Sequence, residues 1–221
     1  MGPVTIDPYP MPTQDVVPRS VAPWSVDPDR AALLIHNMQN HLLRPFPRDH
    51  SPLVDLIGNI SALRRSARRL GLPVVFSAVP PAGRGEQRGL AAEMESAPGT
   101  PERDVAITEE LTPHRGEHLI ANARHNAFLR SHLERILRTT GRDQLILCGV
   151  FAHSGVLLTA ADAFMNDIQP FVVADAVADT SAEEHALALR WTAARGAVVR
   201  TTTNLIDELE AWMTTAPHPA P

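Results

Sequence analysis

The chain of 221 residues falls within the usual span of one α/β domain and can bury a core without disulfides or metals. Its formal net charge of −5 provides no basic field for phosphate backbones, so nucleic acid is not an expected partner. All 20 residues counted as Lys or Arg are arginines, which excludes Schiff-base chemistry and a lysine general acid. Any proton transfer must use His, Asp, Glu, Tyr or water.

The single cysteine, Cys148, lies in an apolar run and is expected to be buried and inert. One cysteine permits no internal disulfide and is typical of a reducing compartment. No apolar stretch reaches the roughly 18 residues of a membrane helix, and the start lacks the pattern of a signal peptide. We therefore expect a cytoplasmic protein with no membrane partner.

Residues 1–29 are rich in proline, which removes backbone donors and blocks helix formation. The segment is predicted to be an extended N-terminal arm. Two interpretations stay open: the arm wraps a neighbouring subunit, or it is a loosely ordered leader. Residues 30–214 are predicted to form one α/β domain, and residues 215–221 a C-terminal tail.

From residue 31 onward, short apolar runs alternate with segments of helical spacing. The predicted strands are 31–36, 73–78, 117–120, 144–148, 170–174 and 197–201, and the predicted helices are 53–70, 126–140, 155–167, 181–195 and 204–213. Such alternation predicts a three-layer α/β/α fold whose doubly wound, six-stranded, mainly parallel sheet carries helices on both faces.

Two segments add detail to this pattern. Residues 80–115 contain Gly, Pro and charge without a clear period, and they are expected to form a pocket wall or lid at the carboxyl ends of the strands. The predicted helix 53–70 carries Arg64, Arg65, Arg68 and Arg69, which we interpret as a solvated basic face.

Three runs resemble the signatures of the isochorismatase-like hydrolases. Residues 31–40 (AALLIHNMQN) resemble the first signature, in which a strand ends in aspartate followed by Met-Gln. Residues 148–171 resemble the second, and Ala174-Asp-Ala-Val-Ala-Asp179, followed by Glu184 and His185, completes the likeness. The resemblance extends over roughly residues 5–210 and looks strongest to the subfamily that hydrolyses isochorismate or its 2-amino analogue in siderophore and phenazine pathways.

The resemblance implies removal of pyruvate from an enol ether, which needs an acid to protonate the enolpyruvyl methylene and water to attack the resulting cation. This chain has Asn37 where the family has its acidic aspartate, and Asn122 matches the family's lysine. A carboxamide does not deliver a proton at neutral pH. Val156 replaces the cysteine of the cysteine-hydrolase relatives, which excludes thiol chemistry.

The resemblance also implies a set of substrate contacts. Arg88 matches the substrate arginine and is expected to grip a carboxylate, and Val79 takes the position of a glutamine. Phe151, Gly155 and Val156 are expected beside the substrate.

His125 is a candidate acid or base, whereas His153 is interpreted as structural. Asp162, Asp175 and Asp179 are expected to act as caps and strand-end hydrogen bonders. The histidines show no metal-ligand spacing, so neither a metal nor a cofactor is predicted.

Three functional hypotheses remain. The first is a repurposed enzyme of aromatic secondary metabolism that binds and converts a chorismate-derived or other aromatic or cyclohexadiene acid, with pericyclic loss or migration of the enolpyruvyl group as a variant. The second is a residual vinyl-ether hydrolase that releases pyruvate by using His125 or water. The third is a catalytically silent assembly protein. The expected partners are a small carboxylic acid and a second copy of the chain.

Overall fold

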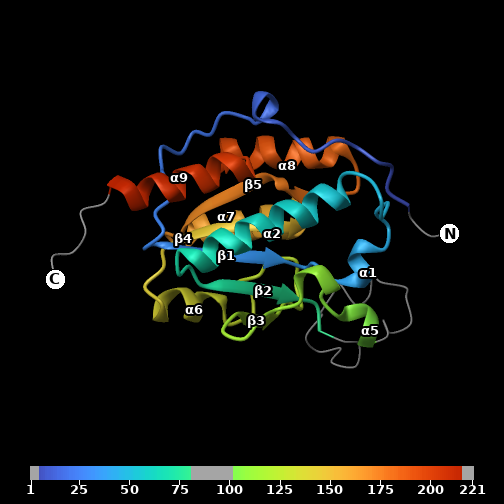
Figure 1. Ribbon diagram of the computed structural model, residues 1–221, viewed down its shortest axis with the longest axis horizontal. Coiled ribbons are helices and arrows are strands. Elements are labelled where there is room, and N and C mark those ends of the chain that lie inside the picture. The colour runs from blue at the N-terminus through green and yellow to red at the C-terminus, as the bar shows by residue number, and fades with distance from the viewer. Residues whose placement is uncertain (1–4, 81–101, 216–221) are drawn as a thin grey trace.

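The apolar run Ala31–His36 forms strand β1, all six residues of which are buried. It lies at the centre of a six-stranded sheet with the order β3-β2-β1-β4-β5-β6, in which every strand pair is parallel. The computed structural model describes residues 5–80 and 102–215 (Figure 1). The remaining strands are β2 (Val74–Ala78), β3 (His118–Ala121), β4 (Gln144–Val150), β5 (Gln169–Ala178) and β6 (Val198–Arg200).

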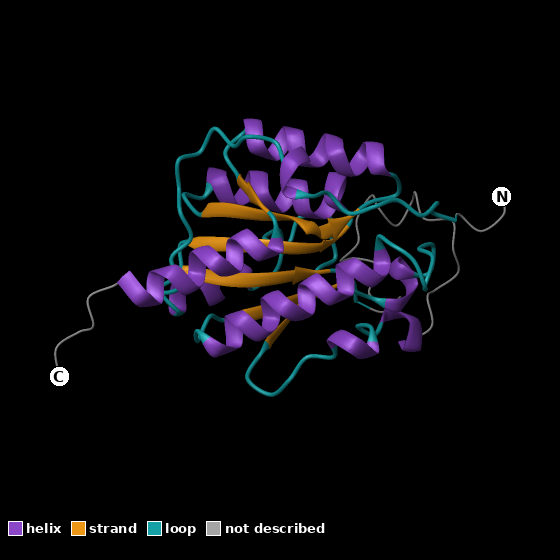
Figure 2. Cartoon of the chain, turned by 45° about the horizontal axis from the view of Figure 1, so that its top comes forward, coloured by secondary structure: helices purple, strands orange, loops and turns teal. Residues whose placement is uncertain are grey.

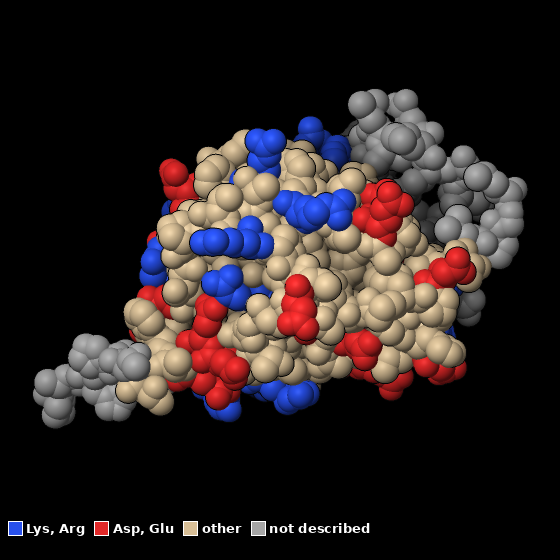
Figure 3. All heavy atoms as spheres, turned by 90° about the horizontal axis from the view of Figure 1, so that it is seen from above, with Lys and Arg blue, Asp and Glu red and all other residues tan. Residues whose placement is uncertain are grey.

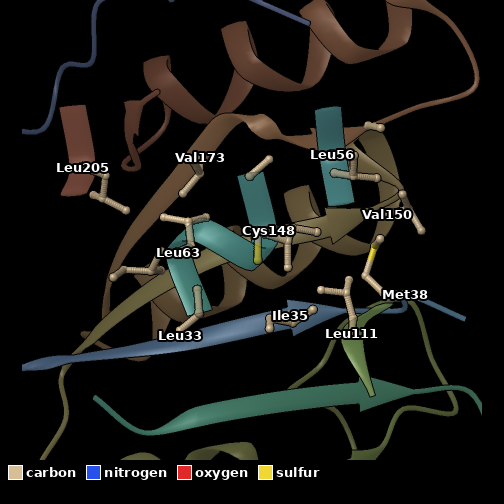
Figure 4. Close-up of a cluster of buried hydrophobic side chains, with 14 of the residues drawn as sticks. Leu33, Ile35, Met38, Leu56, Leu63, Leu111, Cys148, Val150, Val173 and Leu205 are labelled. Atoms are coloured by element: carbon tan, nitrogen blue, oxygen red, sulfur yellow. The ribbon is translucent and has the colours of Figure 1, made fainter. Parts of the chain in front are cut away.

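Helices cover both faces of this sheet (Figure 2). Leu33 and Ile35 of β1 point to the face covered by α2 (Leu53–Arg69) and α9 (Thr202–Thr215), and Figure 4 shows this core. Ala32 and Leu34 point to the opposite face, covered by α6 (Leu133–Thr139), α7 (Leu157–Met165) and α8 (Ala182–Ala194). The two-residue alternation of a strand thus divides the core into two layers, and the predicted three-layer α/β/α class is confirmed.

The strand order fixes where a ligand can bind. The chain leaves β1 toward β2 on one side and returns to β4 on the other, so β1 and β4 are neighbours whose following segments diverge. Crevices at such switch points are the usual ligand sites of doubly wound folds. In Figure 1 the carboxyl ends of β1 and β2 point toward the short helices α1 (Asn40–Leu43) and α5 (Glu102–Val105).

The described part of the N-terminal arm packs against its own domain. It contains one short 3-10 helix at Gln14–Val16, and Ile6, Tyr9 and Val26 are buried in the α2 side of the core. Val21 N donates to Ala193 O of α8 at 3.0 Å. In Figure 1 the arm crosses the molecule above α8, so residues 5–29 are held on the domain rather than loose.

Three sequence predictions need correction. The helix predicted from residue 126 begins only at Leu133, because Asn126 Oδ1 accepts from Phe128 N and so caps a turn instead of a helix. The predicted loop 80–115 includes α5 and a 3-10 helix, Glu109–Leu111. Arg64 is not on the solvated face, since its side chain is 8% exposed and makes two hydrogen bonds to the Glu117 carboxylate, 2.8 and 2.5 Å long.

The expectation for Cys148 is confirmed. Its side chain is fully buried in β4, and burial raises the pKa of the thiol. No helix within residues 5–80 and 102–215 is long and apolar enough to cross a membrane. On the face that carries the arm, α8 and α9, acidic and basic side chains are interspersed around a broad uncharged area (Figure 3).

Candidate active site

A cavity of about 160 Å³ lies at the carboxyl edge of the sheet. A dry apolar cavity of about 150 Å³ accepts benzene, so this space suits a single six-membered ring. Its described lining residues come from the segments that follow β1, β2, β3 and β4. They are Asn37, Leu42, Val79, Asn122, Ala123, Arg124, His125, Phe151, Ser154 and Gly155.

Asn37 is the first residue after β1. Its backbone has φ 54°, a left-handed conformation that asparagine tolerates better than most residues. Its N–H donates to Ser77 O of β2 at 3.0 Å, so the turn keeps the sheet's hydrogen bonding for one residue beyond the strand. The side chain then points into the cavity with 8% exposure.

Asn122 is the first residue after β3 and meets Asn37 at the cavity. Asn122 N donates to Ala78 O at 2.7 Å, and Asn122 Nδ2 donates to Asn37 Oδ1 at 3.3 Å. The side chain is fully buried, and Asn122 Oδ1 has no hydrogen-bond partner within the described part of the chain. A buried, unsatisfied acceptor costs roughly 1–3 kcal/mol, so this pair is built for something other than stability.

His36, which the sequence analysis did not single out, lies directly behind this pair. Its ring is fully buried, Nδ1 lies 2.8 Å from Ser77 Oγ, and Nε2 has no partner among the described residues. Burial, together with the nearby His125, lowers the pKa of His36 to about 3, so the imidazole is neutral near pH 7. Its Nε2 sits against Gly155: a Cβ at that position would lie 2.1 Å from Nε2. Glycine is therefore required there by contact.

The turn after β4 forms another wall. Phe151 stacks on Phe46 with ring centroids 5.8 Å apart, and the peptide bond that precedes Phe151 is cis. His153, in the single turn of π-helix Ala152–Val156, holds this wall through Asp179 after β5: its backbone N and ring Nδ1 each lie 2.6 Å from a carboxylate oxygen. The structural interpretation of His153 and Asp179 agrees with these bonds.

The wall after β2 is fixed by Gln39. Its fully buried side chain accepts from Val79 N at 2.7 Å and donates to Val79 O at 3.0 Å and Val105 O at 2.5 Å. This amide holds Val79 at the cavity. It also ties the end of β2 to α5.

Most of the predicted site residues come together here. Asn37, Asn122, His125, Val79, Phe151 and Gly155 all line the cavity. Val156 does not: it is 1% exposed and packs in the core layer beneath α7 and α8. Arg88 lies outside the described residues.

Four other residues line the cavity and were not predicted from the sequence: Leu42, Ala123, Arg124 and Ser154. Arg124 lies two residues after Asn122, a proximity that could have indicated it. Asp162 and Asp175 are hydrogen bonders as expected, Asp175 through Thr202 N and Oγ1 at the start of α9. Within residues 5–80 and 102–215 no group of three or more His, Cys, Asp or Glu could hold a metal ion.

Comparison with known proteins identifies the family to which this doubly wound α/β chain belongs. The family model described as the isochorismatase domain matches residues 31–204. The chain is 42% identical to phenazine biosynthesis protein PhzD of Pseudomonas fluorescens over 210 residues, which cover 91% of this chain and 97% of the relative. It is 41% identical to the isochorismatase of Bacillus subtilis (strain 168), covering 93% of this chain and 66% of the relative.

Enterobactin synthase component B of Escherichia coli (strain K12) is also 41% identical, over 87% of this chain and 68% of the relative. Among solved structures, a cysteine hydrolase from Pseudomonas syringae pv. phaseolicola shares the fold with a TM-score of 0.77 at 21% identity, covering 86% of this chain and 97% of that one. The chain belongs to the isochorismatase family. Its similarity to phenazine and siderophore proteins confirms the expected branch.

Proposed function

We propose that this protein is an enzyme of aromatic secondary-metabolite biosynthesis that binds a chorismate-derived or other aromatic or cyclohexadiene carboxylic acid and converts it without a carboxyl acid or a lysine. The observation that carries the proposal is the contact between Asn37 and Asn122 in a cavity of single-ring size. The resemblance matches these two positions with the family's aspartate and lysine. In this chain both positions carry a neutral amide side chain.

The chemistry of the described lining residues supports this reading. None of them carries a carboxyl group, and His125 contributes the imidazole of the lining, a side chain that enzymes often use as an acid or base. Two amides can orient a substrate and stabilise developing polarity by hydrogen bonds, but they do not protonate a carbon. Pericyclic loss or migration of an enolpyruvyl group needs only such orientation. Arg88, outside the described residues, is the proposed grip for the substrate carboxylate.

A second candidate function is a residual vinyl-ether hydrolase, which is favoured by the position of His125 at the cavity. In this reaction a protonated His125, or water, gives a proton to the enolpyruvyl methylene. Water then adds to the resulting oxocarbenium carbon, and the hemiketal collapses to pyruvate and a ring alcohol. The names of the relatives, an isochorismatase and a phenazine biosynthesis protein among them, support this alternative.

We also propose that the protein acts in the cytoplasm as a homodimer. Exposed apolar side chains lie on α7 and α8, among them Leu158, Met165 and Trp191. A surface of this kind supports the proposal because a second subunit would cover it. Sedimentation equilibrium of the full chain tests this proposal, and a monomer at micromolar concentration would contradict it.

The test of function is incubation of purified protein with isochorismate and with its 2-amino analogue, followed by pyruvate assay and mass analysis of every organic product. An aromatic or rearranged product supports the repurposed enzyme. Pyruvate with a dihydro product supports the hydrolase, and its rate should then rise in the double variant Asn37→Asp, Asn122→Lys. If neither compound changes and no ring acid binds, the protein is a silent partner and the proposal fails.

A further inference from the structure

We infer that the Asn37–Asn122 pair selects a ring acid whose second substituent is neutral and can both donate and accept a hydrogen bond, such as a hydroxyl or a carboxamide. The inference rests on the proposed function, because it assumes that a ring acid occupies the cavity. It extends the proposed function by naming the chemical group of the ligand that contacts the asparagine pair.

The hydrogen bond between the two asparagine side chains leaves other polar atoms of both amides available to a ligand. Asn122 Nδ2 donates one of its N–H groups to Asn37 Oδ1, so this bond leaves the carbonyl oxygen of Asn122 and the NH₂ group of Asn37 unused. The free oxygen, Asn122 Oδ1, is buried and has no partner among the described residues. Asn37 Nδ2 is the matching donor. Together they require a ligand group that supplies one donor and one acceptor.

This conclusion does not depend on how the two amides are oriented. Nitrogen and oxygen of an amide are assigned from their surroundings, and both side chains can be turned over. If both turn, Asn37 donates to Asn122, and the groups left free are again one carbonyl oxygen and one NH₂ group. The pair therefore presents one donor and one acceptor in either arrangement.

Other substituents fit this surface poorly. A carboxylate or an ether has only acceptors, so it leaves the buried amide oxygen unsatisfied. An ammonium group would need a compensating charge, and no carboxylate is present among the described lining residues. The apolar neighbours Val79, Phe151 and Leu42 strengthen this discrimination, since hydrogen bonds and charges weigh more where water is excluded.

The experiment is calorimetric titration of the full chain with meta- and para-substituted benzoates that carry a hydroxyl, a carboxamide, a methoxy group or a second carboxylate. We expect the hydroxyl and carboxamide acids to bind at least about tenfold more tightly than the methoxy and dicarboxylate acids. In Asn122→Leu, which keeps the volume and removes the hydrogen bonds, the difference should shrink to about twofold. Asn166→Leu, an exposed asparagine on the far end of α7, should leave the preference unchanged.

A second variant guards against a folding defect in Asn122→Leu. Asn37→Asp keeps the volume and tolerates the left-handed backbone, but it replaces the free donor with an acceptor. It should weaken the hydroxyl and carboxamide acids by about tenfold, because their acceptor oxygen then meets a carboxylate in place of an N–H donor. Equal binding of all four acids, or tightest binding of the dicarboxylate, would overturn the inference and leave the proposed function standing. Failure of every ring acid to bind would remove the proposed function and the inference with it.

Discussion

Two polar clusters lie at the carboxyl edge of the sheet, and they differ in how far their hydrogen bonds are satisfied. In the Asp179 cluster (Tyr9, His153, Asp179, Thr180), the buried carboxylate accepts from His153 N, His153 Nδ1 and Thr180 N, and Tyr9 OH bridges the backbone of Asp179. In the asparagine cluster (His36, Asn37, Ser77, Asn122), His36 Nε2 and Asn122 Oδ1 have no partner among the described residues. The first cluster has the paired hydrogen bonds of a stabilising element, and the second has the unpaired polar atoms expected of the ligand site proposed above.

The largest expected effect is the loss of the satisfied cluster. Asp179→Ala leaves His153 N and Thr180 N without their acceptor, so we expect the free energy of unfolding to fall by about 3 kcal/mol. Urea denaturation measures this change. Asp207→Ala, at an exposed position of α9, is the control and should stay within about 0.5 kcal/mol of the unaltered protein. If both variants behave alike, Asp179 does not anchor the turn.

The buried histidine of the asparagine cluster should make stability depend on pH. The unfolded chain takes up a proton at His36 near its ordinary pKa of 6.5, whereas the folded chain does so only near pKa 3. The contribution of His36 is therefore complete above pH 6.5 and is lost progressively as the pH falls toward 3. Between pH 7 and pH 4 the loss should be about 3 kcal/mol.

Urea denaturation at the two pH values, compared with the variant His36→Gln, measures the effect. The variant removes the titrating group and keeps a polar partner for Ser77. His185, whose pKa is lowered chiefly by burial, titrates in both proteins and cancels in the difference. Parallel pH dependence in the two proteins would argue that His36 is not buried as described.

A smaller effect tests the packing between the two clusters. Gly155→Ala drives a Cβ into His36 Nε2, so we expect the free energy of unfolding to drop by about 2 kcal/mol. Gly58→Ala in α2, where a Cβ would meet nothing within 4 Å, should instead raise it by about 0.5 kcal/mol through helix propensity. Thermal and urea denaturation of the two variants measure whether each substitution raises or lowers the free energy of unfolding. A stabilised Gly155→Ala would refute the close contact with His36.

The smallest expected effect is the most diagnostic. Asn122→Leu removes an unsatisfied acceptor together with one long hydrogen bond to Asn37, and because these changes offset each other the free energy of unfolding should change by less than about 0.5 kcal/mol. Asn59→Leu removes a satisfied amide, whose Nδ2 donates to Asp175 O at 2.6 Å, and should lower it by about 1 kcal/mol. Equal losses in both variants would contradict the comparison.

The fold was predictable because apolar runs and their alternation are local features. The runs at 31–36 and 144–148 lie within strands β1 and β4, and the helices α2 and α8 end within about one residue of their predicted bounds. The helix expected from residue 126 failed because one asparagine side chain competes for a backbone donor two residues away.

The site was less predictable, since its contacts join distant segments. Asn37 and Asn122 were recognisable from family signatures. Their hydrogen bond was not, because it joins residues that are 85 positions apart in the sequence. Arg64 looked like part of a solvated helix face because its partner, Glu117, is 53 residues away. The role of His36 depends on burial and on contact with Gly155, which no local pattern encodes.

The Gln39 side chain anchors two segments that are distant in the sequence, and it does so through their backbones. One amide holds Val79 and Val105 together, so the two ends of the intervening segment are fixed independently of what lies between them. Since all three bonds use backbone atoms of Val79 and Val105, we expect the anchor at Gln39 to persist whichever side chains those two positions carry.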